Sequence, residues 1–325
     1  MTLGEALRSG RTGNLDALRL LLAAAVIVSH AWPLALGPGT PEPLEALTGH
    51  SLGGWAVALF FFLSGLLVTA SAERRAARGF WVARARRILP GLGAALLVTL
   101  ALAFASGAHA DPAEAAAYFL RALTLVSIEH RLPGAFAANP FPEVVNGPLW
   151  SLFHEVAAYA VCALAVAAGV TRSRTRILAL AVAASMAAMA GDVLPGRAAT
   201  FAPLFAAFAL GMAAHVFRDG LIMRPGLAVL LLPLVVLAPW PVAVAVLGYA
   251  SLALALRAPA LPLDGDFSFG LYIYGWPVAQ TVVHALPGIG PAALAVASLL
   301  AALPFAVASW HLVERPVLHR RQGAA

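Results

Sequence analysis

Ten long apolar runs, separated by short polar segments, most constrain how this chain of 325 residues can fold. A helix that crosses a bilayer needs about 20 mostly apolar residues. Inside lipid, a helix satisfies its backbone hydrogen bonds within one segment. We therefore predict an all-α polytopic membrane protein with about ten transmembrane spans, at residues 15–36, 52–71, 88–107, 149–170, 175–190, 199–217, 224–239, 240–256, 267–285 and 290–312.

The seventh and eighth predicted spans are short, and only Pro239-Trp-Pro241 separates them. A single re-entrant pair is the alternative. The first apolar run, Leu20–Val28, follows Arg8 and Arg11 as it would in a signal peptide. No convincing small-residue cleavage site follows it, so we interpret it as a retained first span.

The remaining sequence predicts one membrane domain over residues 1–325, without an appended soluble domain. Its longest non-spanning segment, 108–148, is expected to hold a short interfacial helix around Ala113–Ile128. The one cysteine, Cys162, lies inside an apolar run. A thiol buried in such surroundings is usually inert, so a catalytic thiolate is not expected.

The charges of this chain are few and are arranged by side of the membrane. Only 11% of residues are charged, whereas soluble domains are typically about a quarter charged. All 21 basic residues are arginines in short runs between apolar segments, which favours topogenic charge over nucleic-acid binding. If the N-terminus is cytoplasmic, 18 arginines fall on that side and three outside, namely Arg121, Arg131 and Arg197. Both termini are therefore predicted to be cytoplasmic.

The first predicted span contains an arginine and a histidine, and ionisable groups within spans are costly and often functional. Arg19 and His30 are eleven residues apart, which places them on one helical face about 16 Å apart along the axis. Arg19 lies near the cytoplasmic surface, which its side chain can reach by snorkelling. His30 lies too deep for that. It is either a catalytic group or a histidine that hydrogen-bonds between helices.

Glu155 in the fourth predicted span is expected at nearly the same depth as His30. A carboxylate can orient an imidazole and stabilise its protonated form, as general base catalysis requires. His154 is adjacent to Glu155, but neighbouring helix positions diverge by about 100° and do not face one site. We therefore predict a His30–Glu155 pair. Two unrelated interhelical contacts are the alternative.

A basic cluster lies at the cytoplasmic start of the third predicted span and comprises Arg84, Arg86 and Arg87. Topology alone would explain some of this charge. Arg84 and Arg87 share a helical face, next to where Arg19 is expected to emerge. Arginines grip phosphates through charge-assisted, often bidentate hydrogen bonds. The cluster therefore indicates a phosphate-bearing donor that enters from the cytoplasm.

Six segments in order resemble motifs of the acyltransferase-3 family of integral membrane acyltransferases. Each motif alone is weak, but the series extends from residue 15 to residue 316. Two departures are visible: Gly275 stands where many members carry a histidine, and only one acidic residue, Glu155, follows His154. The segments are Leu15-Asp-Ala-Leu-Arg19 with His30, Leu59–Gly65, Arg84–Pro90, Asn146–Glu155, Ser268–Pro277 and His311–Pro316.

The resemblance implies ten core spans in a bacterial cytoplasmic membrane, a cytoplasmic acyl-CoA donor (commonly acetyl-CoA) and a hydroxyl acceptor on a carbohydrate or other envelope molecule. It implies that His30 is catalytic. It also implies that the donor is bound by Arg19, Arg84, Arg86 and Arg87. It further implies that Ser64, Trp150 and Ser151 line the path or orient the substrates. Tyr272 and Trp276 are expected to stack on a sugar, unless they are interfacial anchors. No metal and no permanently bound cofactor are expected.

Two other functions are compatible with the same residues. Intramembrane His30 and Glu155 could form the proton relay of a transporter or flippase. No inverted repeat, such as many transporters have, is visible in the sequence. A family member that has lost catalysis and acts as a scaffold is the third possibility, and the presence of Arg19, His30 and Glu155 argues against it.

Overall fold

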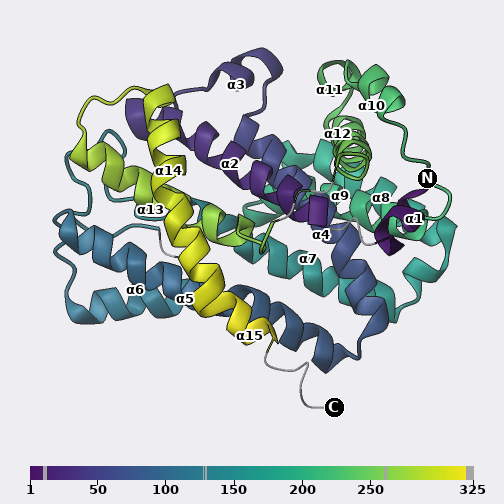
Figure 1. Cartoon of the computed structure of the whole chain (residues 1–325), viewed down its shortest axis with the longest axis horizontal. Coiled ribbons are helices and arrows are strands. Elements are labelled where there is room, and N and C mark those ends of the chain that lie inside the picture. Colours follow the sequence, from purple (N-terminus) through teal and green to yellow (C-terminus); the bar gives the residue numbers. More distant parts are fainter. Residues whose placement is uncertain (10–12, 127, 129, 260, 262, 320–325) are drawn as a thin grey trace. The chain divides into compact units, whose positions relative to one another are not determined.

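The computed structural model describes the chain except residues 10–12, 127, 129, 260, 262 and 320–325. The described residues form helices, turns and two isolated bridges, and they contain no β-strand. The all-α prediction is therefore confirmed (Figure 1). The longer α-helices are α2 (Gly13–Leu36), α4 (Leu52–Arg74), α5 (Ala77–Ala105), α6 (Pro112–Thr124), α7 (Trp150–Ala167), α8 (Arg174–Met189), α9 (Arg197–Val216), α12 (Trp240–Ala255), α13 (Ser268–Ala285) and α14 (Pro291–Ser309).

Short elements connect or extend these helices. The sequence did not predict the N-terminal helix or the helix at residues 43–48. The short elements are α1 (Leu3–Arg8), α3 (Pro43–Thr48), α10 (Pro225–Leu231), α11 (Leu234–Leu237), α15 (Arg315–His319), the 3-10 turns η1 (Gly147–Leu149), η2 (Val170–Arg172) and η3 (Gly191–Val193), and the π-helical turn η4 (Trp310–Glu314).

Six helical segments of the described chain are long and apolar enough to cross a membrane. Other predicted spans coincide with α8, α12 and α13, which are not among these six. The protein is thus a multi-pass membrane protein by its helices, while the count of ten stays a prediction. The six segments are Asn14–Leu36, Leu52–Arg74, Ala77–Ala105, Gly147–Ala167, Arg197–Val216 and Pro291–Leu318.

The seventh predicted span, 224–239, is interrupted. Its residues form α10 and α11, and Leu232 and Pro233 lie between these two short helices. Proline lacks a backbone N–H and its ring clashes with the preceding turn, so it disfavours a continuous helix. The apolar pattern predicted the helical residues here but missed the break.

The chain folds into two compact units, each assembled from several segments. The first unit comprises Met1–Arg19, Trp55–Phe80 and His154–Asp264. The second unit comprises Leu20–Gly54, Trp81–Phe153 and Gly265–Ala325. Both units draw on residues that are far apart in the sequence, so each is held by tertiary contacts rather than by local chain order.

In the first unit, α8 packs against α9, and α12 packs against both. Helices α4 and α9 approach closely through two glycines. A Cβ atom on Gly65 would lie 2.0 Å from the Phe208 carbonyl oxygen, and one on Gly211 would lie 2.0 Å from the Phe62 carbonyl oxygen. Neither position can hold a side chain without moving backbone, so these glycines set the α4–α9 distance.

The N-terminal helix α1 is attached to the first unit by backbone and side-chain contacts. The Leu3 and Gly4 amides donate to the carbonyls of Leu221 and Arg218, at 2.8 Å each. Arg8 forms an exposed ion pair with Asp219 at 2.8 Å. The Arg8 guanidinium lowers the pKa of the Asp219 carboxyl below its usual range.

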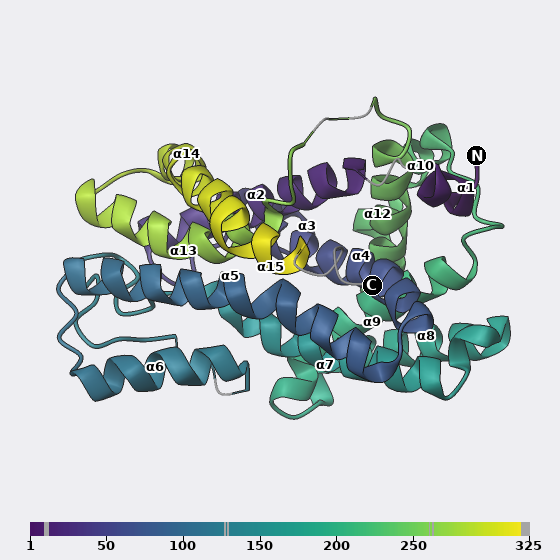
Figure 2. The same ribbon diagram turned by 60° about the horizontal axis from the view of Figure 1, so that its bottom comes forward.

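In the second unit, α13 and α14 pack side by side, and α6 lies alongside α5 in both views (Figures 1 and 2). Helix α6 begins with a capping box, in which Asp111 and Glu114 each accept the other residue's backbone N–H. Such a box satisfies amides that the first turn would otherwise leave unbonded. The helix predicted around Ala113–Ile128 is therefore confirmed, with its end at Thr124.

Candidate functional site

His30 lies in α2 within the second unit, and its ring is half-buried. The edge of Trp276 from α13 packs against it, with ring centroids 5.0 Å apart and an interplanar angle of 78°. Edge-to-face contacts of this kind are favourable for aromatic rings. The structure therefore brings together two residues that the sequence singled out separately.

Trp276 is held firmly on its other sides. Its indole Nε1 donates a hydrogen bond to the Val144 carbonyl at 2.8 Å, and Phe141 meets its ring edge-on at 5.4 Å. A Cβ atom on Gly147 would lie 3.3 Å from the indole ring, so the chain passes very close at this glycine. Trp276 is only 6% exposed, which makes it part of the wall around His30.

Gly275 also contributes to this wall. A Cβ atom at position 275 would lie 2.6 Å from the Ile27 side chain of α2. Ile27 thus occupies the space where a larger residue in α13 would project. The departure from the family pattern at Gly275 therefore has a packing explanation, since α2 and α13 approach more closely here than a histidine would allow.

Ser151 and Tyr272 form a second contact in the same unit. Their hydroxyl oxygens lie 2.7 Å apart, and each also lies within hydrogen-bond distance of the Pro148 carbonyl oxygen, at 3.1 Å for Ser151 and 3.2 Å for Tyr272. Both side chains are buried, whereas the neighbouring Trp150 is 38% exposed. The predicted substrate residues Ser151 and Tyr272 therefore meet at the start of α7.

Asn146 anchors this turn to α13, a role that its place at the start of the motif Asn146–Glu155 does not by itself indicate. It is fully buried, and its amide nitrogen donates to the Ile273 carbonyl at 3.0 Å and to the Thr99 hydroxyl at 3.3 Å. A buried asparagine directly before a Gly-Pro turn is the signal that would have marked it. Its contacts fix the turn that carries Gly147 and Pro148.

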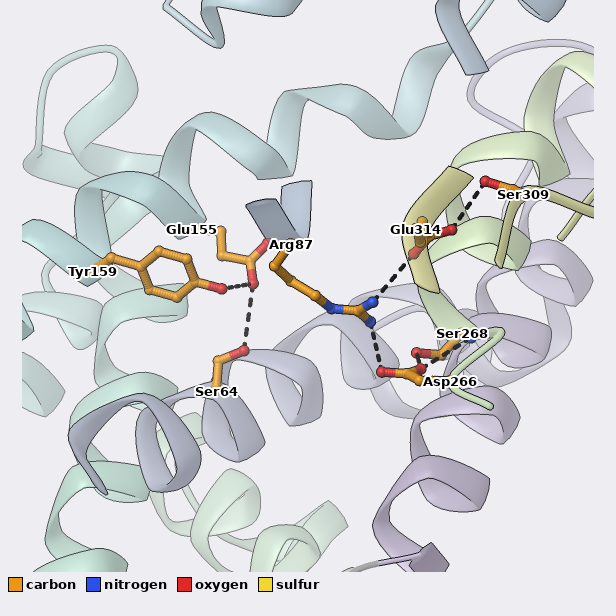
Figure 3. Close-up of polar contacts among 8 residues, drawn as sticks. All are labelled: Ser64, Arg87, Glu155, Tyr159, Asp266, Ser268, Ser309 and Glu314. Atoms are coloured by element: carbon orange, nitrogen blue, oxygen red, sulfur yellow. Dashed lines mark hydrogen bonds and ion pairs between the residues drawn. The ribbon is translucent and has the colours of Figure 1, made fainter. Parts of the chain in front are cut away.

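Glu155 lies in α7 within the first unit, where its partners are Tyr159 and Ser64 (Figure 3). Tyr159 donates its phenolic hydrogen to Glu155 Oε1, and the Ser64 hydroxyl lies 3.5 Å from the same oxygen. Sequence reasoning missed Tyr159, although residues four apart on a helix are neighbours. The predicted residues Ser64 and Glu155 are thus brought together.

His154 lies on a different face of α7 from Glu155. Its ring stacks on Phe201 from α9, with centroids 6.2 Å apart and an interplanar angle of 24°. The expected divergence of His154 and Glu155 is therefore confirmed. The His30–Glu155 pair stays a prediction, because the two residues belong to different units.

The three arginines of the basic cluster lie on α5 within the second unit, and one of them has strong ionic partners. Arg87 pairs with Asp266 at 2.6 Å and with Glu314 at 3.2 Å (Figure 3). Sequence reasoning missed both carboxylates. Arg84 and Arg86 are half-buried on the same helix. Arg19 belongs to the first unit, so its proximity to them stays a prediction.

Cys162 is fully buried, and its sulfur lies 3.6 Å from the Thr69 hydroxyl. This environment agrees with the expected inert thiol. Among the residues that the structure describes, no group of three or more histidine, cysteine, aspartate or glutamate side chains is arranged to hold a metal ion.

Comparison with known proteins gives a consistent result along nearly the whole chain. A family profile described as an acyltransferase domain matches residues 12–311. The chain is 30% identical to an O-acetyl transferase of Shigella phage Sf6, over 94% of this chain and 96% of that protein. It is 27% identical to Nodulation protein 10 of Rhizobium leguminosarum bv. viciae, over 96% and 95% respectively. No solved structure matches the chain.

Proposed function

Because this chain belongs to the acyltransferase-3 family and is an acyltransferase, we propose that it moves an acetyl group from acetyl-CoA to a hydroxyl of an envelope glycan or related acceptor. The observation that carries this proposal is the position of His30, a half-buried histidine whose ring is held against Trp276. A relative that is an O-acetyl transferase supports both the acetyl group and a hydroxyl acceptor.

The proposed reaction needs one group that moves a proton. The acceptor oxygen attacks the thioester carbonyl carbon while the His30 ring takes the hydroxyl proton. The carbon–sulfur bond then breaks, the ester forms, and the proton passes from His30 to the departing CoA thiolate. Glu155 orients His30 in this proposal and stabilises the protonated ring. A covalent acyl-histidine intermediate is a variant of the same scheme.

The proposed donor site uses arginines on the cytoplasmic side. Arg19, Arg84 and Arg86 bind the CoA phosphates, because guanidinium groups match phosphate geometry. Arg87 was predicted to join them, but it would have to leave two carboxylates to do so. The asymmetric count of 18 arginines against three supports a cytoplasmic N-terminus, ten spans and a bacterial cytoplasmic membrane.

The proposed acceptor side is formed by residues around α7 and α13. Ser151 and Tyr272 share a hydrogen bond, and Trp150 is partly exposed beside them. Trp276 was predicted to stack on a sugar, but its contacts with His30 and Val144 support a role in orienting His30. Ser64 hydrogen-bonds Glu155 and supports its position. The family assignment favours this enzyme over the transporter alternative.

Transfer of radiolabel from acetyl-CoA to a crude envelope extract tests the proposal. We expect label on the acceptor with the purified, reconstituted protein, and none with His30→Ala. His50→Ala, at an exposed histidine, is the matched control and should keep full activity. Retained transfer by a folded His30→Ala variant would contradict the assignment, and label that stays on CoA with the unaltered protein would favour the transporter.

A further inference from the structure

Two of the six sequence motifs meet at one ion cluster in the second unit, which we call the Arg87 clasp and which comprises Arg87, Asp266 and Glu314 (Figure 3). Arg87 comes from the motif at the start of α5, and Glu314 from the motif after α14. Asp266 lies two residues before Ser268, where the motif of α13 begins. Segments far apart in the sequence therefore meet through one guanidinium group.

The clasp is well buried, and its carboxylate oxygens have further partners. Glu314 is 1% exposed, Asp266 11% and Arg87 17% in their side chains. Glu314 Oε1 accepts the Ser309 hydroxyl at 2.9 Å. Asp266 Oδ1 accepts the Ser268 hydroxyl and the Ser268 backbone N–H. A buried ion pair is stable only when such additional hydrogen bonds are present, and here they are.

Local structure shapes the space around the guanidinium. The π-helical turn η4 ends at Glu314, and such turns often occur at functional positions. Gly91 lies one turn beyond Arg87 on α5, and a Cβ atom there would be 2.9 Å from Phe269 and 3.2 Å from the Glu314 carboxyl carbon. The Phe269 ring lies 5.6 Å from the Arg87 guanidinium carbon, within cation–π range. The clasp is therefore enclosed on several sides by close packing.

The clasp connects to the candidate site through α13. Asp266 bonds the first residue of this helix, Ser268, and the same helix carries Tyr272 and Trp276. Trp276 packs against His30, and Tyr272 bonds Ser151. Fixing the start of α13 to α5 therefore helps to fix the side chains that surround His30.

The charge of the clasp opposes binding of a phosphate. Two carboxylates surround one guanidinium, so the cluster carries a formal charge of −1 when all three groups are ionised. A phosphate that approaches the Arg87 guanidinium meets these two carboxylates, and it would have to displace Asp266 or Glu314, of which Glu314 is nearly inaccessible to solvent.

We propose that Arg87 is a positioning residue that holds α13 in place for catalysis, and that it is not a ligand of the acyl donor. In the proposed donor site, the donor phosphates are then bound by Arg19, Arg84 and Arg86 without Arg87. This inference rests on the proposed function, because it assigns the arginines of the same site. It also explains why the Arg87 guanidinium contacts Glu314 from the last motif and Phe269 from the motif of α13.

A double-mutant cycle between Arg87 and Glu314 separates the two roles, using kcat and KM for acetyl-CoA. We expect Arg87→Gln and Glu314→Gln each to lower kcat by about 100-fold, because small displacements of catalytic groups cost that much. KM for acetyl-CoA should change little. The double variant should be no worse than the more affected single variant, because residues that act through one contact are non-additive.

A donor-binding role for Arg87 predicts a different pattern and would overturn the inference. Arg87→Gln would then raise KM for acetyl-CoA, Glu314→Gln would leave it unchanged or lower it, and the two effects would add. Exposed positions provide matched controls, Arg78→Gln on α5 and Glu45→Gln on α3, and these should match the unaltered enzyme.

Asp266→Asn provides a second test if the Glu314 variant does not fold, as judged by a monodisperse profile in detergent. The inference predicts a lower kcat with an unchanged KM for acetyl-CoA. A lower KM would instead indicate that a released Arg87 binds the donor. Acetyl transfer by the His30→Ala variant would refute the proposed function. It would leave the result of the Arg87–Glu314 double-mutant cycle unchanged, so the proposed function and the role of Arg87 can be refuted separately.

Discussion

His30 and Trp276 meet edge to face with ring centroids 5.0 Å apart, and Trp276 is itself tied to the Val144 carbonyl by a 2.8 Å hydrogen bond. The wall beside the candidate catalytic histidine is thus held from the loop that precedes α7. A histidine that performs acid–base chemistry depends on its ring orientation. We therefore expect the Trp276–Val144 hydrogen bond to influence the orientation of the His30 ring.

Trp276→Phe should weaken both stability and activity. Phenylalanine keeps an aromatic ring but loses the indole N–H, which leaves the buried Val144 carbonyl with one fewer donor. We expect a loss of about 1 kcal/mol in unfolding free energy. We also expect a reduced kcat, because the ring can rotate away from His30. Thermal unfolding in detergent measures the stability, and an acetyl-transfer assay measures kcat. Trp81→Phe, at a 39% exposed position, is the control and should change neither the stability nor kcat.

Tyr159→Phe should lower kcat by about tenfold, because it removes a hydrogen bond to a charged group. Tyr159 donates to Glu155 Oε1, while Ser64 lies 3.5 Å from the same oxygen. Ser64→Ala should therefore have a smaller effect. Tyr249→Phe is the matched control, since the Tyr249 hydroxyl donates to the Ile222 carbonyl and accepts the Arg224 backbone N–H, far from Glu155 in the sequence. Equal activity in the Tyr159 variant and the unaltered enzyme would exclude a role for this contact.

Gly65→Ala should destabilise the first unit by about 1–3 kcal/mol, because an added methyl group would overpack the helix contact. The new Cβ atom would lie 2.0 Å from the Phe208 carbonyl oxygen. Gly93→Ala provides the contrast, since no atom lies within 4 Å of its added Cβ. In a helix this change should stabilise by about 0.5–1 kcal/mol. Unfolding midpoints of both variants would test the pair, and a tolerated Gly65→Ala would show that α4 and α9 can separate.

Asp219→Asn should reduce stability at neutral pH but not in acid. Arg8 lowers the pKa of Asp219 in the folded protein, so the pair stabilises above the unfolded-state pKa. This contribution disappears as the pH falls through the lower, folded-state pKa. The pair is exposed, so high salt should also weaken it. Melting temperatures across pH at low and high salt measure this, with Asp264→Asn, at another exposed position, as the control. A salt-independent difference would contradict an electrostatic origin.

Apolar runs predicted the helices well, because a buried or lipid-facing helix needs a long apolar segment wherever it packs. The predicted spans 52–71, 240–256 and 267–285 coincide closely with α4, α12 and α13. The same pattern missed the interruption between α10 and α11, which depends on Pro233 within an otherwise apolar run. The single domain over residues 1–325 and the cytoplasmic termini stay predictions.

The candidate site shows the limits of local pattern more clearly. Glu155 and Tyr159 are four residues apart in the sequence, yet their hydrogen bond is seen only in the folded helix. Asp266 looked like an ordinary loop residue, since nothing in the local sequence indicates a distant arginine. Contacts between segments far apart in the chain depend on how the helices pack. Hydrophobic periodicity does not indicate which helices will pack against each other.

The sequence by itself determined the helical membrane class through its long apolar runs, and the family resemblance through the series of motifs that begins with Arg19 and His30. Those conclusions need only composition, spacing and the cost of charge in lipid. Tertiary structure alone decided that Trp276 meets His30 and that Arg87 is bound by Asp266 and Glu314. The physical reason is that ring contacts and ion pairs act over a few ångströms, and only packing brings such residues within that range.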